Sequence, residues 1–158
     1  MMHSGQIENA STGTSEYDFS SYFHHLEHKI KNADIAIANM EFTLAGKPYT
    51  GYPAFSAPEA YAKYLAELGI DVFLTANNHI FDKGASGADR TISEFRKLGV
   101  SITGIARDQQ MYDQVFPLIL ECKGASIALV NVTYGTNTGI GKAWPKIIRL
   151  SEKEAMAT

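Results

Sequence analysis

The sequence has no apolar run long enough to cross a membrane. Nowhere in its 158 residues does it approach the roughly 18 consecutive apolar residues that a spanning helix requires. The N-terminal residues 1–6 have neither a basic region nor an apolar segment, so they do not form a signal peptide. We therefore expect no signal or transmembrane segment in this chain.

Cysteine is almost absent. The one thiol, Cys122, excludes an internal disulfide and says little about the redox compartment. It lies in a strand-like run just before Lys123 and Gly124, which favours a buried, unreactive thiol.

An excess of basic residues is also missing. The formal net charge is −3 and the isoelectric point is near 5.9. The densest lysine pairs, Lys29 with Lys31 and Lys142 with Lys146, are too sparse to form a basic face. We therefore expect no nucleic-acid partner.

The composition is that of a folded domain. Hydrophobic residues make up 45% and charged residues 20% of the chain, enough to bury a core. The length corresponds to one ordinary domain. Residues 4–14 are small and polar and predict a loop, whereas residues 19–30 carry one apolar stripe at helical spacing.

The middle of the chain repeats one pattern. A short strand is predicted over 35–38 and a long loop over 41–55, which at this length is more often functional than incidental. Pro58 suits the first turn of a helix ending at Gly69, before a strand over 70–74. A second helix over 87–98 ends at Gly99, before a strand over 100–103. Alternating strands and helices predict an α/β fold with a largely parallel sheet and flanking helices.

The C-terminal third predicts different structure. Residues 115–121 and 125–132 read as two strands joined by a short turn, which indicates a hairpin. Residues 136–158 contain two glycines and Trp144-Pro145, followed by a polar end that resembles an incomplete helix.

The most informative stretch follows the strand over 70–74. Asn77, Asn78 and His79 come directly after it, with Asp82 and a glycine-rich entry to the next helix close behind. In open α/β sheets, ligands bind at the carboxyl ends of the strands. Asparagine supplies a neutral oxygen donor, and histidine can ligate a metal or transfer protons near neutral pH. The alternative is an asparagine-rich turn, since asparagine tolerates left-handed backbone angles.

A second set of polar residues should share this edge. Asn39 and Glu41 follow the strand over 35–38, and parallel neighbours would bring them within side-chain reach of Asn78 and His79. A carboxylate, an amide oxygen and an imidazole form part of a divalent-metal site. Glu41 could equally cap a backbone turn, and both interpretations stay open.

Other candidates are weaker. His24 and His28 have helical spacing that can hold a metal, but with His25 they point away from the apolar stripe, so we predict a solvated face. Arg107 lies on the rim after the third strand, where it could bind phosphate or carboxylate or simply be a surface charge.

Taken together, these motifs resemble the bacterial capsule-synthesis family of the CapA and PgsA type, within the calcineurin-like metallophosphoesterase superfamily. The resemblance covers about residues 17–135 and rests on the following segments: Tyr17-Asp18-Phe19, Ala33-Asp34, Asn39-Met40-Glu41, Phe55-Ser56-Ala57-Pro58, Ala76-Asn77-Asn78-His79 with Asp82, Gly84, Gly87 and Thr91, and Gly104-Ile105-Ala106-Arg107.

The resemblance implies a partial metallophosphoesterase-like α/β/β/α fold and assigns roles to individual residues. It makes His79 the catalytic residue beside a bound phosphate, and Asn78 and Glu41 ligands of a divalent metal (Mn, Zn or Fe). The remaining edge residues become substrate-binding candidates: Asn39, Asn77, Asp82 and Arg107. The Gly-Asp strand that opens the family's domain and its later His-rich motif are not found, which predicts a single incomplete domain over 1–158.

Two functions follow from this resemblance. One is a metal-dependent, phosphoesterase-like hydrolase acting on a phosphate-bearing or peptide-like envelope substrate. The other is a non-enzymatic accessory protein that binds an anionic capsule polymer such as poly-γ-glutamate during its synthesis or export. Both imply a cell-envelope location and membrane-bound synthesis partners. The missing strand further predicts self-association through an unpaired sheet edge and weak metal binding.

Overall fold

The computed structural model describes residues 1–150, and its centre is a three-stranded parallel sheet in the order β1-β2-β3. β1 (Ile37–Asn39) pairs with β2 (Val72–Leu74), which pairs with β3 (Ser101–Thr103), so all three strands end at one edge. The predicted α/β fold with a parallel sheet is confirmed.

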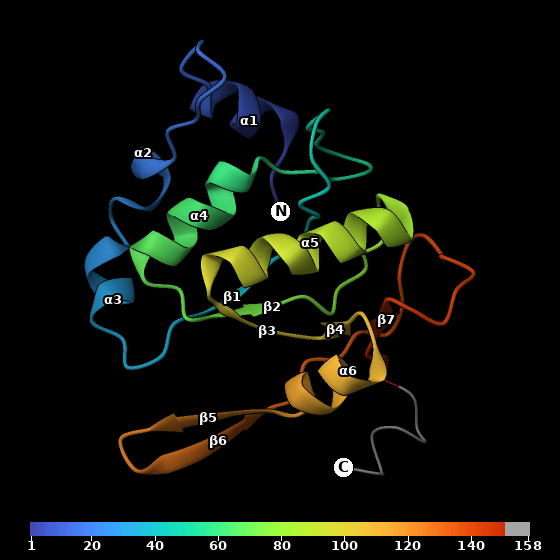
Figure 1. Ribbon diagram of the computed structural model, residues 1–158. Coiled ribbons are helices and arrows are strands. Elements are labelled where there is room, and N and C mark those ends of the chain that lie inside the picture. Colours follow the sequence, from blue (N-terminus) through green and yellow to red (C-terminus); the bar gives the residue numbers. More distant parts are fainter. Residues whose placement is uncertain (151–158) are drawn as a thin grey trace.

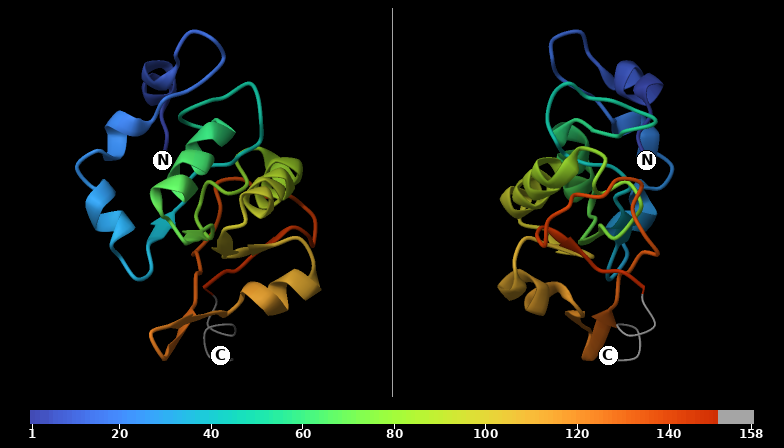
Figure 2. Two further views of the ribbon diagram at one scale, coloured as in Figure 1. Left: turned by 60° about the vertical axis from the view of Figure 1, so that its left-hand side comes forward. Right: turned by 90° about the vertical axis from the view of Figure 1, so that its right-hand side faces the viewer.

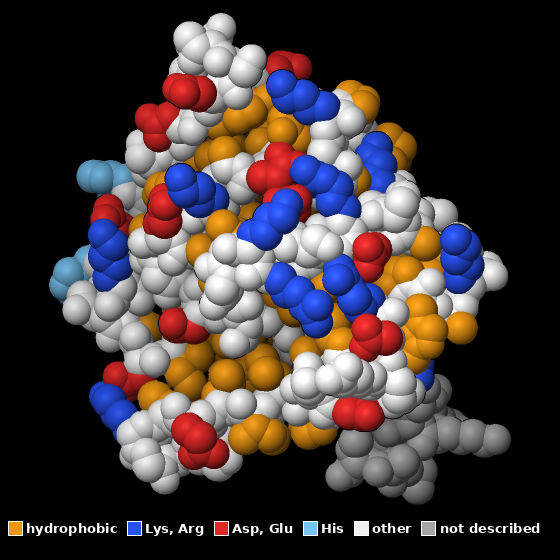
Figure 3. Space-filling model, in the orientation of Figure 1, with side chains coloured by type: hydrophobic (Ala, Val, Ile, Leu, Met, Phe, Trp, Pro, Cys, Tyr) orange, Lys and Arg blue, Asp and Glu red, His pale blue; other side chains and the backbone are white. Residues whose placement is uncertain are grey.

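Two helices, α4 (Glu59–Leu68) and α5 (Gly84–Leu98), cover one face of this sheet and lie side by side (Figures 1 and 2). Each buries an apolar stripe, and the Phe73 ring of β2 stacks on Phe95 of α5 at a centroid distance of 4.9 Å. Gly69 and Gly99 end the helices with positive φ angles of 112° and 70°, as a left-handed C-terminal cap requires. On their outer face, basic side chains gather among acidic ones (Figure 3).

The N-terminal segment corrects two predictions. Residues 4–10 are not a loop but helix α1 (Ser4–Ala10), which buries Ile7 and Ala10. The helix predicted over 19–30 is broken into α2 (Ser20–Phe23) and α3 (Glu27–Lys31). The break lets Phe23 pack against Tyr61 and Tyr64 while Ile30 reaches the turn at Gly69. His24, His25 and His28 are exposed, as predicted.

The C-terminal part leaves the parallel sheet. β4 (Ile105–Ala106) pairs antiparallel with β7 (Lys146–Ile147), and helix α6 (Gln109–Val115) follows β4. Neither β7 nor α6 was predicted. β7 has only two residues and α6 buries only Met111, so neither leaves a periodic pattern of apolar residues in the sequence.

The predicted hairpin is confirmed, with shorter strands: β5 (Leu118–Cys122) and β6 (Ala125–Leu129). Figure 1 shows it extending away from α4 and α5. Cys122 is half-buried, not buried as expected, because this arm packs only partly against the body. The polar end predicted as an incomplete helix lies largely outside the described residues, and within residues 1–150 no helix is long and apolar enough to span a membrane.

Candidate functional site

The ends of β1 and β2 bring two asparagines together. The Asn77 amide donates through Nδ2 to the Met40 carbonyl at 2.9 Å, and the same nitrogen lies 3.4 Å from Oδ1 of Asn39. Asn77 Oδ1 accepts from the backbone N–H of His79 at 3.1 Å. Buried Asn77 therefore ties the two strand ends to each other and fixes the backbone just before His79.

His79 is paired with a carboxylate three residues further on. Its Nδ1 lies 2.8 Å from Oδ2 of Asp82, and the two side chains are only 9% and 2% exposed. The same Asp82 oxygen accepts from the backbone N–H of Phe55 at 2.8 Å. Asp82, predicted to bind substrate, is therefore in contact with His79 and with the long loop over 41–55 (the covering loop).

The long loop over 41–55 packs against the imidazole. The Phe55 ring meets the His79 ring edge-on, at a centroid distance of 4.7 Å and an interplanar angle of 83°. A carboxylate on Nδ1 fixes the tautomer and the orientation of a histidine, which leaves Nε2 as the nitrogen that can exchange a proton. The arrangement therefore suits a proton-transferring histidine.

A third segment reaches this edge from far along the chain. The backbone N–H of Asn137 donates to the Asn78 carbonyl at 2.9 Å, and Asn78 Nδ2 lies 3.3 Å from Oδ1 of Asn137. Asn137 Nδ2 is also 3.3 Å from Nδ1 of His79. Sequence reasoning missed Asn137, and the polar, glycine-containing segment around it was the one signal that could have indicated a site loop.

A hydrogen-bonded cluster anchors the covering loop. Tyr49 donates from its hydroxyl to Glu59 at 2.6 Å, and Arg90 forms an ion pair with the same carboxylate at 2.5 Å. Burial alone would raise the pKa of Glu59, but Tyr49 and Arg90 outweigh it and lower the pKa below its usual value. Burial and the neighbouring carboxylate raise the pKa of Tyr49. The cluster therefore joins the loop to α4 and α5.

The predicted metal ligands form only part of a coordination shell. Glu41 is half-buried just beyond β1, and Asn78 is half-buried beyond β2. Within residues 1–150 no group of three or more His, Cys, Asp or Glu side chains is placed to hold a metal ion. Glu41 and Asn78 alone are too few side chains to complete a metal centre.

Arg107 lies among residues of α5. Its Nε is 3.1 Å from Oδ1 of Asp89, and its terminal nitrogen donates to the Asp89 carbonyl at 3.1 Å and to Ser93 Oγ at 2.7 Å. Arg107 therefore links the end of β4 to α5. These contacts do not include His79 or Asp82.

Comparison with known proteins identifies relatives of this chain. The capsule biosynthesis protein CapA of Bacillus anthracis is 29% identical over 96 residues, which are 57% of this chain and 23% of that relative. This chain thus corresponds to about a quarter of the curated relative it matches. The model of one family, described as bacterial capsule synthesis protein PGA_cap, matches residues 1–157. Because this family model covers almost the whole chain, the chain belongs to the bacterial capsule synthesis family.

Proposed function

We propose that this chain acts at the cell envelope in making an anionic capsule polymer, and that it carries a hydrolase-like site in which His79 transfers the proton. The observation that carries the proposal is the buried contact of 2.8 Å between Nδ1 of His79 and Asp82. A phosphate-bearing group, or an acidic peptide-like polymer such as poly-γ-glutamate, is the proposed substrate class.

The chemistry assigned to each residue follows from its contacts. His79 would take a proton at Nε2 from an attacking water, then return it to the leaving oxygen. Asp82 is a positioning residue, because its carboxylate holds the imidazole through Nδ1 and stabilises the imidazolium that forms. The Phe55 N–H bond keeps that carboxylate in place, and the Phe55 ring limits the orientations open to His79. Asn39, exposed at the same edge, is a proposed substrate contact, whereas buried Asn77 and α5-bound Arg107 hold the fold around the site.

A divalent cation is a separate element of the proposal. Glu41 and Asn78 would supply two oxygen ligands, and Mn²⁺, Zn²⁺ and Fe²⁺ are the candidates. Because a partial ligand set loses much of the chelate binding energy, we expect the chain to lose Mn²⁺ on dialysis. Retention of stoichiometric metal, measured by elemental analysis, would show that the ligand set is more complete than these two residues.

Hydrolysis of bis(4-nitrophenyl) phosphate, with and without added Mn²⁺, tests the role of His79. His79→Gln should lower kcat/KM by about 10²-fold or more. Asp82→Asn should lower it by about 10- to 100-fold and move the pH profile, which a purely structural defect would not do. The matched control is His24→Gln, on the exposed α2–α3 segment. Equal rates for the wild type and His79→Gln would refute a catalytic His79.

One observation favours a second function, polymer binding without turnover. Asn39 and Asn137 are exposed and Asn78 is half-exposed at the same edge, and amides can hydrogen-bond a polar chain without any reaction. In that case Asn78→Ala should weaken binding of a fluorescent poly-γ-glutamate, measured by anisotropy, while no variant alters phosphodiester hydrolysis. Membrane-bound synthesis proteins are the proposed partners in either case.

A further inference from the structure

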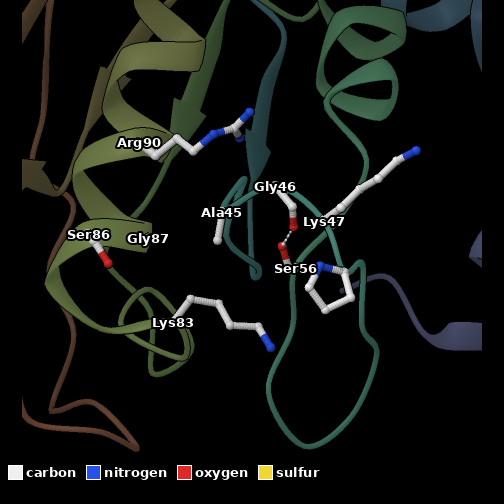
Figure 4. A pocket seen from close by; sticks show the side chains of 9 residues that line it. Ala45, Gly46, Lys47, Ser56, Lys83, Ser86, Gly87 and Arg90 are labelled. Carbon is white, nitrogen blue, oxygen red and sulfur yellow. Dashed lines mark hydrogen bonds between the residues drawn. The ribbon is translucent and has the colours of Figure 1, made fainter.

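A pocket of about 260 Å³ lies next to the turn that carries His79, since Lys83 and Ser56 line it. It lies between the covering loop and the start of α5, and its lining includes Gly46, Ser56, Lys83, Ser86 and Arg90 (Figure 4). Its volume is just below the roughly 300–1,000 Å³ that is usual for ligand pockets. The pocket therefore suits a small molecule, or one end group of a larger one.

The charged side chains that line this pocket are all basic. Its lining contains Lys47, Lys83 and Arg90 and no carboxylate. Lys47 points away from the pocket, whereas Lys83 extends into it toward Ser56 (Figure 4). Within residues 1–150 Lys83 has no ion-pair partner, but Arg90 is held by Glu59 and Glu94. Lys83 is therefore the one inward-pointing cation that no carboxylate neutralises among these residues.

The start of α5 adds polar donors to the same wall. Lys83 is the N-cap residue, no side chain caps the helix, and its first turn has no acidic residue. The Ser86 hydroxyl, one turn inside α5, also lines the pocket. The N-terminus of a helix favours a negative group, which strengthens the preference that Lys83 already creates.

Gly87 controls the shape of the pocket wall. A Cβ at this position would lie 2.5 Å from Lys83 Cβ and 3.2 Å from Ala45 Cβ. Glycine therefore lets the covering loop pack closely on α5 while the Lys83 stem keeps its course into the pocket. The pocket is formed by this close packing and not by a loose surface loop.

We propose that this pocket binds an oxyanion, a phosphate or a carboxylate group, through Lys83. His79 and Asp82 do not line this pocket, but it adjoins them. Ser56 and Lys83 in its wall directly follow Phe55 and Asp82 in the sequence. The pocket would hold an anionic group beside the His79 turn whether or not His79 is catalytic.

Protection of lysines from acylation, followed by peptide mass spectrometry, tests this on the unmodified chain. The probes are inorganic phosphate and glutarate, each compared with sodium chloride at equal ionic strength. Lys83 should be protected with a saturable dependence on anion concentration, whereas Lys29, exposed on α3, should react at an unchanged rate. The stronger protecting anion identifies the preferred group.

Variants then establish the role of the charge. By calorimetry, Lys83→Gln should weaken binding of that anion by about tenfold or more, and Lys29→Gln should leave it unchanged. Lys83→Arg, which keeps the charge, should retain most of the affinity. Equal protection of Lys83 and Lys29, or equal affinity of Lys83→Gln and the wild type, would overturn the proposal, even if His79 proves catalytic.

Discussion

The loop over 75–83 and the β5–β6 hairpin both lie outside the parallel sheet, but different kinds of contact hold them in place. In the loop, Thr75, Asn77 and His79 are buried polar residues, and each has a partner from a distant part of the chain: Thr103, Met40 and Asn137 in turn. In the hairpin no residue is fully buried, and five cross-strand pairs join neighbours in sequence. Distant partners fix side chains tightly enough for chemistry, whereas a local ladder fixes mainly the backbone.

The largest expected difference between these regions comes from two glycines with similar backbone angles. Gly104 has φ +108° and Gly124 has φ +81°. A Cβ on Gly104 would lie 2.2 Å from Oδ1 of Asn131 and 2.3 Å from the Ala76 nitrogen, where those two atoms form a hydrogen bond. Gly104→Ala should therefore lower the free energy of unfolding in urea by about 3 kcal/mol or more.

Gly124→Ala is the matched control, because nothing lies within 4 Å of the added Cβ. Only backbone strain remains there, which should cost about 1 kcal/mol. Equal losses for the two variants would mean that the loop over 75–83 does not depend on its distant contacts.

The covering loop should respond to pH through Glu59. Its folded-state pKa lies below the usual value of 4.5, so its stabilising effect is present above about pH 4.5 and is lost as the pH falls through the lowered pKa. Glu59→Gln should lower the free energy of unfolding by about 1–2 kcal/mol at pH 7. The difference from the wild type should shrink toward zero as the pH falls through the lowered pKa, measured by urea unfolding across pH.

Glu67→Gln is the control on the same helix. Glu67 faces Lys63 at 3.6 Å, with both side chains 65% exposed, so its removal should change stability by no more than about 0.5 kcal/mol. A Glu59→Gln deficit that persists at acid pH would show that shape, and not charge, holds the covering loop.

The smallest effect on stability is expected in the hairpin. Ile119 is 52% exposed, so Ile119→Ser should change the free energy of unfolding by less than about 0.5 kcal/mol. We also expect the chain to self-associate at micromolar concentration, because this arm exposes apolar side chains. Sedimentation velocity should then show weaker association for Ile119→Ser.

Leu26→Ser provides the comparison for association, since Leu26 is 49% exposed and lies between α2 and α3, outside the hairpin. A wild-type chain that sediments as a monomer would contradict the association. Equal weakening by both substitutions would mean that the hairpin has no special part in it.

Sequence reasoning succeeded where the signal was local. The two helix-to-strand joints at Gly69 and Gly99 placed α4, β2, α5 and β3 in order, because glycine caps and buried stripes act over a few residues. The hairpin was found for the same reason, and the edge shared by Asn39 and Asn77 followed from the parallel pairing.

What escaped prediction depends on distant contacts. Asn137 lies 58 residues beyond His79, and no periodicity links the two. α1 buries only Ile7 and Ala10, so its polar residues resembled a loop. Asp82 was identified as a site residue, but only the fold shows that its carboxylate turns toward His79 and Phe55.

The single thiol offers a practical handle on this molecule. Cys122 is half-buried next to the Lys123-Gly124 turn, and the hairpin lies apart from the α4–α5 face (Figures 1 and 2). A maleimide fluorophore would therefore attach at one defined position, without a cysteine background to remove. Its anisotropy would follow the docking of the arm onto any partner while His79 and Lys83 stay unmodified.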